Sequence, residues 1–159
     1  MLELNASTVR LGAAAATKEE AIRQVGQLLV DAGYIAPGYV ESMLGREGEA
    51  NTYLGNGIAI PHGMGKDREL IRRTGIAVLQ LPAGVPWKEG ERARLLIGIA
   101  ARSDEHLTVL ANLVDVLGDP AVAEQLATTD DPALIVGRLP RPRDGAAPAA
   151  DGQWEGVPA

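Results

Sequence analysis

The sequence contains no cysteine and no phenylalanine, and its 159 residues include only three tyrosines and two tryptophans. Without cysteine the protein can form no disulfide, thiol nucleophile or thiolate metal site. Because aromatic residues are so few, the core must be aliphatic, and the 46% hydrophobic content is enough to build an aliphatic core. A chain of this length is expected to form one domain.

Positive charge is also scarce, since 15 Lys and Arg against 21 Asp and Glu give a net charge of −6 at pH 7. An acidic chain without a basic run is poorly suited to nucleic acid or to anionic lipid. No stretch reaches the ~18 apolar residues that cross a bilayer. Residues 1–5 also lack the features of a signal peptide. These observations predict a cytoplasmic protein that binds no nucleic acid and does not insert into a membrane.

The first third of the chain carries the signals of two helices. Residues 17–20 (TKEE) form a capping box, and apolar residues then recur at helical spacing through residues 22–29. Gly33 is placed to end this helix. A second helix is predicted from Pro37, which suits a first turn, to Arg46. The polar stretch that follows, residues 47–52, is predicted to be a loop.

The middle of the chain is typical of buried strands. Residues 76–81 and 94–100 are short, nearly continuous apolar runs, which suit strands covered by helices on both faces. Residues 82–86 (PAGVP) have the composition of a turn between them. Residues 58–60 form a third short run that Pro61 ends.

Helical patterns return after these strands. Ser103 can cap a helix whose apolar stripe ends at Leu117, and Asp119 and Asp131 each precede a proline suited to a first helical turn. Strands that alternate with helices predict an α/β fold. Residues 140–159 are rich in Pro, Ala and Gly and are predicted to be a flexible tail, with Trp154 as its one aromatic.

His62 is one of two histidines and directly follows Pro61. Gly63 and Gly65 come next, and glycine allows another molecule to approach the backbone closely. We therefore expect an imidazole at a strand end, on an open loop, where a macromolecular partner can reach its ring nitrogen.

The second histidine, His106, lies near the start of the helix that follows the strand at 94–100. Such junctions line the binding crevice of open α/β sheets, so His62 and His106 could share one cleft. A zinc site needs three or four ligands. Asp104 and Glu105 could contribute, but no metal-binding spacing is present. The nucleophile elbow of serine hydrolases and the glycine-rich phosphate loops are absent too. We expect neither a metal nor a cofactor.

Phosphoryl transfer through histidine fits these residues better. A free imidazole has a pKa of about 6.5, so a neutral nucleophile is available at pH 7. A second ring N–H could bind the phosphoryl oxygens, and the guanidinium of Arg46 could supply positive charge. From the residues alone, non-functional explanations for the two histidines and for Arg46 stay open. Lone histidines are often structural, and an arginine at a helix end is often only solvated.

Residues 52–63 (TYLGNGIAIPHG) resemble the phosphorylation-site motif of EIIA domains of the bacterial phosphoenolpyruvate:sugar phosphotransferase system, mannitol/fructose type. Residues 15–22 are similar to the start of the first helix of the mannitol EIIA. Residues 94–106 are similar to its strand and second-histidine helix. The resemblance runs from about residue 2 to 138, which predicts an EIIA domain at 1–139 and leaves the tail outside the family pattern.

The resemblance implies a mixed β-sheet with helices on both faces, and a role for each site residue. His62 would accept phosphoryl from phospho-HPr as a tele-phosphohistidine and pass it to an EIIB domain of a membrane EIICB or EIIB–EIIC permease. His106 would stabilise the phosphoryl group, and Arg46 would stabilise its charge. The resemblance assigns no role to Glu47 or Glu49.

The predicted function is that of a phosphotransferase in the uptake of mannitol or a related sugar, as a free-standing EIIA whose partners are separate chains. The alternative is a regulatory EIIA-like domain whose phosphorylation state gates a partner protein. A plain structural domain with incidental histidines is the third hypothesis. The sugar itself is chosen by the membrane EIIC partner, so this sequence does not fix it.

Overall fold

The structure is a computed structural model that describes the backbone of residues 6–102 and 105–139 and the side chains of residues 7–102 and 111–139. A five-stranded sheet with the order β1-β4-β5-β3-β2 forms its centre. The pairs β1–β4 and β3–β5 are parallel, whereas β4–β5 and β2–β3 are antiparallel, so the sheet is mixed as predicted. The strands are β1 Val9–Arg10, β2 Tyr53–Gly55, β3 Ile58–Ala59, β4 Gly75–Lys88 and β5 Glu91–Ala100.

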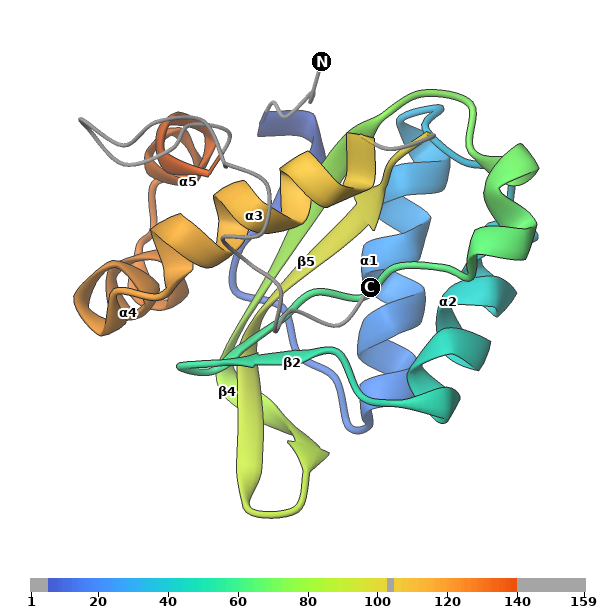
Figure 1. The fold of residues 1–159 in the computed structure, drawn as a ribbon. Coiled ribbons are helices and arrows are strands. Elements are labelled where there is room, and N and C mark those ends of the chain that lie inside the picture. The colour runs from blue at the N-terminus through green and yellow to red at the C-terminus, as the bar shows by residue number, and fades with distance from the viewer. Residues whose placement is uncertain (1–5, 103–104, 140–159) are drawn as a thin grey trace.

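Helices cover both faces of this sheet, which confirms the predicted α/β class (Figure 1). The first two pack on one face and the last three on the other. The α-helices are α1 Lys18–Asp31, α2 Tyr39–Glu49, α3 Glu105–Leu117, α4 Pro120–Thr128 and α5 Pro132–Arg138. Two short 3₁₀ segments, η1 Ala6–Thr8 and η2 Gly65–Leu70, complete the described elements.

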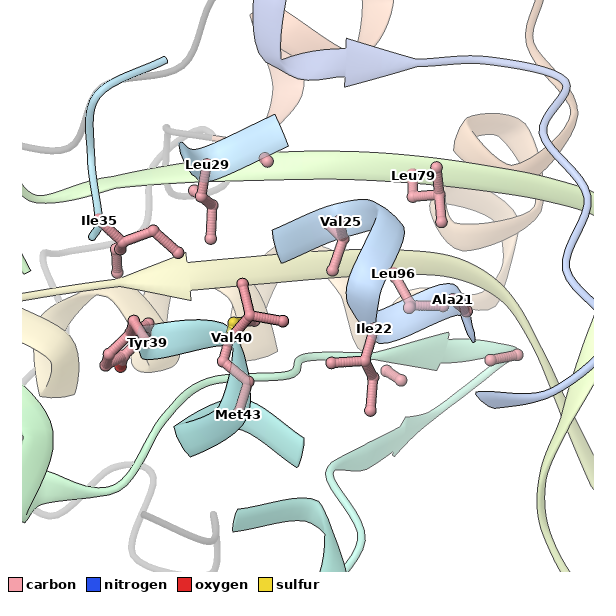
Figure 2. Packing of buried hydrophobic residues seen from close by; sticks show 14 of the residues in the cluster. Ala21, Ile22, Val25, Leu29, Ile35, Tyr39, Val40, Met43, Leu79 and Leu96 are labelled. Carbon is pink, nitrogen blue, oxygen red and sulfur yellow. The ribbon is translucent and has the colours of Figure 1, made fainter. Parts of the chain in front are cut away.

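The core has two halves because alternate residues of a strand point to opposite faces of the sheet. Leu79 and Leu96 face α1 and α2, whereas their neighbours Val78 and Leu95 face α3, α4 and α5. Both sets are apolar, as predicted for strands buried on both sides. Figure 2 shows the first half, in which aliphatic side chains of α1 and α2 meet over the sheet; among them are Ile22, Val25, Leu29, Val40 and Met43.

Gln80 is a polar exception within the apolar run of β4 and is only 3% exposed. Its Oε1 accepts a hydrogen bond from Gly12 N at 3.0 Å. Its Nε2 donates to the carbonyl oxygens of Leu126 at 3.2 Å and Thr129 at 2.8 Å. The buried amide therefore ties β4 to the segment after β1 and to the end of α4.

The predicted ends of α1 and the predicted starts of α4 and α5 are confirmed. Glu20 N donates to Thr17 Oγ1 at 3.1 Å, which is half of the predicted capping box, and Gly33 follows α1 with a φ of 82°. Asp119 and Asp131 accept from the backbone two residues ahead, each at 2.9 Å. The predicted cap at Ser103 and the predicted tail, residues 140–159 with Trp154, lie outside the described residues.

Two predicted boundaries are wrong. Helix α2 begins at Tyr39 rather than Pro37, which lies in the preceding turn, and continues to Glu49. The stretch predicted as a loop from residue 47 is thus partly helical, because the Glu47 side chain turns inward and is buried.

The segment 82–86 is not a turn either, since β4 runs through it to Lys88. Register shifts between Gln80 and Val85 and between Pro86 and Lys88 let this part of the strand accommodate prolines, which cannot donate to a ladder. The chain reverses after Lys88, where Gly90 has a φ of 79°.

Strands β1 and β2 were not predicted from the sequence. Strand β2 pairs with β3 across Asn56 and Gly57, whose φ values of 55° and 78° are those of a tight hairpin turn. The Asn-Gly pair is a strong hairpin signal that was available in the sequence. No helix in the described residues is long and apolar enough to cross a membrane.

Candidate functional site

His62 lies just beyond β3, at the strand end where the sequence placed it. Ile99 N donates to the carbonyl oxygen of Pro61 at 2.9 Å, and His62 forms an isolated parallel bridge with Ile99 of β5. The backbone that carries the imidazole is thus fixed to a central strand of the sheet. This gives the ring a rigid base although no long strand precedes it.

A hydrogen bond to the backbone orients the His62 ring. Its Nδ1 lies 2.8 Å from the carbonyl oxygen of Ile60. Because a carbonyl oxygen can only accept, Nδ1 carries the hydrogen, and the nucleophilic lone pair is on Nε2. In this tautomer the tele nitrogen is the one that can attack an electrophile.

The expectation of a bare, open loop around His62 is wrong, because the residue is only 5% exposed. The glycine after it does not leave empty space. Tyr39 Oη accepts from Gly63 N at 2.9 Å, and a Cβ built on Gly63 would lie 2.4 Å from Cζ of Tyr39. Glycine is required here because the tyrosine ring occupies the volume that any side chain would need.

Helix α2 holds the loop at a second point, since Met64 N donates to Ser42 Oγ at 2.8 Å. Burial raises the pKa of the Tyr39 hydroxyl, while its hydrogen bond from Gly63 N acts in the opposite direction. Tyr39 is therefore a neutral hydroxyl at physiological pH. Its oxygen holds the His62 loop by accepting a hydrogen bond from the Gly63 N–H.

A buried carboxylate supports the same loop from further away. Glu47 is 6% exposed, and its oxygens accept from Thr52 N at 3.0 and 3.2 Å and from Thr52 Oγ1 at 2.6 Å. Thr52 in turn accepts from Ile60 N at 3.0 Å through its carbonyl oxygen. Since Ile60 also holds the His62 ring, Glu47 connects the end of α2 to the histidine. The sequence offered no signal for this, because acidic residues in a polar stretch are usually solvated.

His62 opens onto a pocket of about 410 Å³. Arg46 lines it too, so the structure brings these two predicted site residues together. Arg46 lies in the last turn of α2 and donates from Nη1 to the carbonyl oxygen of Ala50 at 2.7 Å. The pocket is lined by Tyr39, Arg46, Glu49, His62, Gly63, Met64, Gly65, Arg68, Ile71, Ile99 and Ala101.

The third predicted residue, His106, is the second residue of α3, and its side chain lies outside the described part. Its predicted place in the cleft stays a prediction. The chain passes from β5 through Ala101, which lines the pocket, before α3 begins. The backbone route to His106 therefore leaves from this cleft.

Tyr39 and Arg68 are among the pocket residues that were not expected from the sequence. The sequence around Tyr39 does not indicate a role in the site, because only the contact of Tyr39 with Gly63, far away in the chain, brings it there. Arg68 belongs to the charged run Lys66–Glu69, which is typical of a solvated surface segment. Within the described residues no group of three or more His, Cys, Asp or Glu is placed to hold a metal ion.

Comparison with known proteins decides the family. The family model described as "Phosphoenolpyruvate-dependent sugar phosphotransferase system, EIIA 2" matches residues 3–139. The chain belongs to this family. Its EIIA region contains every described element of the fold.

Similar proteins carry related names. A "Multiphosphoryl transfer protein" of Xanthomonas campestris pv. campestris is 58% identical over 146 residues, which are 90% of this chain and 17% of that protein. The "PTS system mannitol-specific EIICBA component" of Escherichia coli (strain K12) is 47% identical over 131 residues, which are 81% of this chain and 21% of that protein. The EIIA chain thus spans only a minor part of these two longer relatives.

The EIIA fold is also seen in a solved structure, the "Complex of enzyme IIAMTL and phosphorylated enzyme IIBMTL from Escherichia coli". The match has a TM-score of 0.79 at 44% identity and covers 86% of this chain and 97% of that chain. The sheet and helices that hold His62 are therefore shared with a mannitol enzyme IIA.

Proposed function

We propose that this EIIA domain is a phosphocarrier that accepts a phosphoryl group on His62 from phospho-HPr and passes it to an EIIB domain, for uptake of mannitol or a related sugar. The observation that carries the proposal is the His62 ring. It is locked by the Ile60 carbonyl with Nε2 as the nucleophilic nitrogen, in a pocket that Arg46 also lines.

In the first step the Nε2 lone pair forms a bond to phosphorus while the donor's phosphorus–nitrogen bond breaks. Its electron pair returns to the donor's imidazole. The Nδ1 hydrogen stays on Nδ1, where it donates to the Ile60 carbonyl oxygen, so His62 needs no base to activate it. In the second step the P–Nε2 bond breaks in the same way as an EIIB nucleophile attacks. Such transfers pass through a loose transition state and depend on alignment and charge stabilisation.

Arg46 is proposed to bind the phosphoryl oxygens with its guanidinium fork, because its position at the end of α2 faces the same pocket. Its Nη1 contact with the Ala50 carbonyl orients the group in advance. His106 is proposed to donate a ring N–H to the phosphoryl group. That role is carried over from the family resemblance and from the junction of β5 and α3.

Support for the partners comes from the relatives. The E. coli relative is named as a mannitol-specific EIICBA component, and the matching solved structure holds an enzyme IIA with a phosphorylated enzyme IIB. A phosphocarrier that meets HPr and an EIIB domain would work in the cytoplasm, which we propose as its location. The proposed phosphotransferase activity needs no metal or cofactor of its own.

Incubation with phosphoenolpyruvate, Enzyme I and HPr tests the first step. The wild-type protein should become labelled on His62, and the acid lability of the label should identify a phosphoramidate bond. His62→Ala should take up no label although it folds. Arg46→Gln and His106→Ala should be labelled more slowly with little loss of stability. Full labelling of His62→Ala would refute the assignment.

A second assay separates transport from regulation. Phosphorylated wild-type protein is mixed with isolated EIIB domains of the mannitol and fructose permeases, and loss of label from His62 is followed. Rapid transfer to one of them supports the transport function and identifies the sugar class. If none accepts the label although His62 is phosphorylated, the regulatory alternative is favoured instead.

A further inference from the structure

Arg68 is a second arginine in the His62 pocket, and nothing in the family resemblance assigns it a role. It lies on η2, the short 3₁₀ segment that starts three residues after His62 and packs against α2, seen as the green helical segment beside α2 in Figure 1. The pocket therefore receives one arginine from each of two elements, Arg46 from α2 and Arg68 from η2.

The guanidinium of Arg68 is directed back over the loop. A Cβ built on Gly65 would lie 3.8 Å from Arg68 Nη2, and the positive charge is close enough to Tyr39 to oppose the rise in the pKa of that hydroxyl. No ion pair or side-chain hydrogen bond of Arg68 is found within the part of the chain that the structure describes. Its five N–H donors are thus available to a ligand in the pocket.

The charge of the proposed intermediate calls for such a group. A phosphoryl group carries close to two negative charges at neutral pH. One arginine balances half of this, and the nearby carboxylates Glu49 and Asp67 add negative charge around the pocket. The whole chain has a net charge of −6, so general attraction does not provide the balance. A second guanidinium in the pocket would balance the remaining negative charge of the phosphoryl group.

We propose that Arg68 binds the phosphoryl group on His62 from η2 and so acts as a second charge-stabilising residue of the transfer. The inference rests on the proposed function of His62. It adds a residue of this chain to the reaction, with Arg46 and Arg68 holding the same phosphoryl group between them.

The test uses Arg68→Gln, with Arg68→Lys to keep the charge but lose the fork and Lys66→Gln as the matched control. Lys66 lies on the same segment and is exposed but does not line the pocket. Four quantities are measured: the equilibrium between phospho-HPr and the phosphorylated protein, the apparent KM for phospho-HPr, the ³¹P resonance of phospho-His62 in the absence of any partner, and the thermal midpoint.

For Arg68→Gln we expect the equilibrium to shift about three- to tenfold toward phospho-HPr, since Arg68 is exposed and its charge-assisted bonds are partly screened. The ³¹P resonance should move as well, Arg68→Lys should be intermediate, and Lys66→Gln should stay within about twofold of wild type. The thermal midpoint should be unchanged in all three.

Two outcomes would overturn the proposal. If Arg68→Gln leaves both the equilibrium and the partner-free ³¹P resonance unchanged, Arg68 does not touch the phosphoryl group. If only the apparent KM for phospho-HPr rises, Arg68 contacts the donor protein instead. Failure of the proposed function looks different, because then the wild-type protein itself takes up no phosphoryl group.

Discussion

The contact between Gly63 and Tyr39 gives the sharpest prediction, which is that Gly63→Ala damages both stability and phosphoryl transfer. The new methyl group would lie 2.4 Å from Cζ, 2.5 Å from Cε1 and 2.7 Å from Oη of Tyr39. Ordinary contact begins at about 3.4 Å, so the ring or the loop must move by about 1 Å. Tyr39 is only 3% exposed, and its ring has little room to move away.

The magnitude follows from two losses. Overpacking a buried contact costs about 1–3 kcal/mol, and loss of the Gly63 N–H to Tyr39 Oη bond costs about 1 kcal/mol. A total of about 2–4 kcal/mol corresponds to a fall of about 5–15 °C in the thermal midpoint for a chain of this size. A displacement of about 1 Å next to the reacting nitrogen can lower a rate by about a hundredfold. We therefore expect labelling of His62 to slow by about ten- to a hundredfold.

Thermal unfolding followed by circular dichroism and single-turnover labelling from phospho-HPr measure the two effects. Gly48→Ala is the matched control, because Gly48 is exposed in α2 and nothing lies within 4 Å of its added Cβ. That change should stabilise the protein by about 0.5–1 kcal/mol and leave the rate unchanged. A double-mutant cycle with Tyr39→Ala should show that the alanine at 63 costs less once the ring is gone. An equal cost in both backgrounds would refute the steric reasoning.

Three further predictions concern the groups that hold the site and the sheet. Glu47→Ala should lower the free energy of unfolding by about 2–4 kcal/mol in urea, since Thr52 loses its buried acceptors; a loss below about 1 kcal/mol would mean that water replaces the carboxylate. Gln80→Leu should cost about 2–3 kcal/mol, because Gly12 N loses its acceptor, and a neutral result would contradict this. The folded-state pKa of Tyr39 is raised, so its contribution to stability is present below the unfolded value of about 10 and is lost as pH rises through the folded value. Tyr39→Phe should thus flatten the fall of the urea midpoint above pH 10, and an unchanged slope would contradict it.

Part of the fold is determined by residues close together in the sequence and was predicted from the sequence. Thr17, Gly33, Asp119 and Asp131 each act on backbone groups a few residues away, so their capping roles need no tertiary information. The continuous apolar runs of β4 and β5 likewise predict burial on both faces. The same local logic placed His62 at a strand end, because Pro61 stops the run before it.

Long-range contacts decided the rest. The inward turn of Glu47 depends on Thr52 being brought within reach, and the passage of β4 through Pro82 and Pro86 depends on pairing with β5. Neither can be read from the composition of those segments, since polar stretches and proline-rich stretches usually form loops. Tertiary pairing overrode the local preference in both places.

The site itself divides in the same way. The sequence by itself determined that His62 follows a strand and that the chain resembles an EIIA domain. The resemblance also implied the tele nitrogen as the acceptor, and the tertiary structure supplied the physical reason, which is the hydrogen bond of Nδ1 to the Ile60 carbonyl. Only the tertiary structure decided why Gly63 must be glycine, through the Tyr39 ring. It also placed Arg46 and Arg68 in one pocket. The physical reason is that hydrogen-bond partners and excluded volume are set by residues far apart in the chain, whereas caps and apolar periodicity are set by near neighbours.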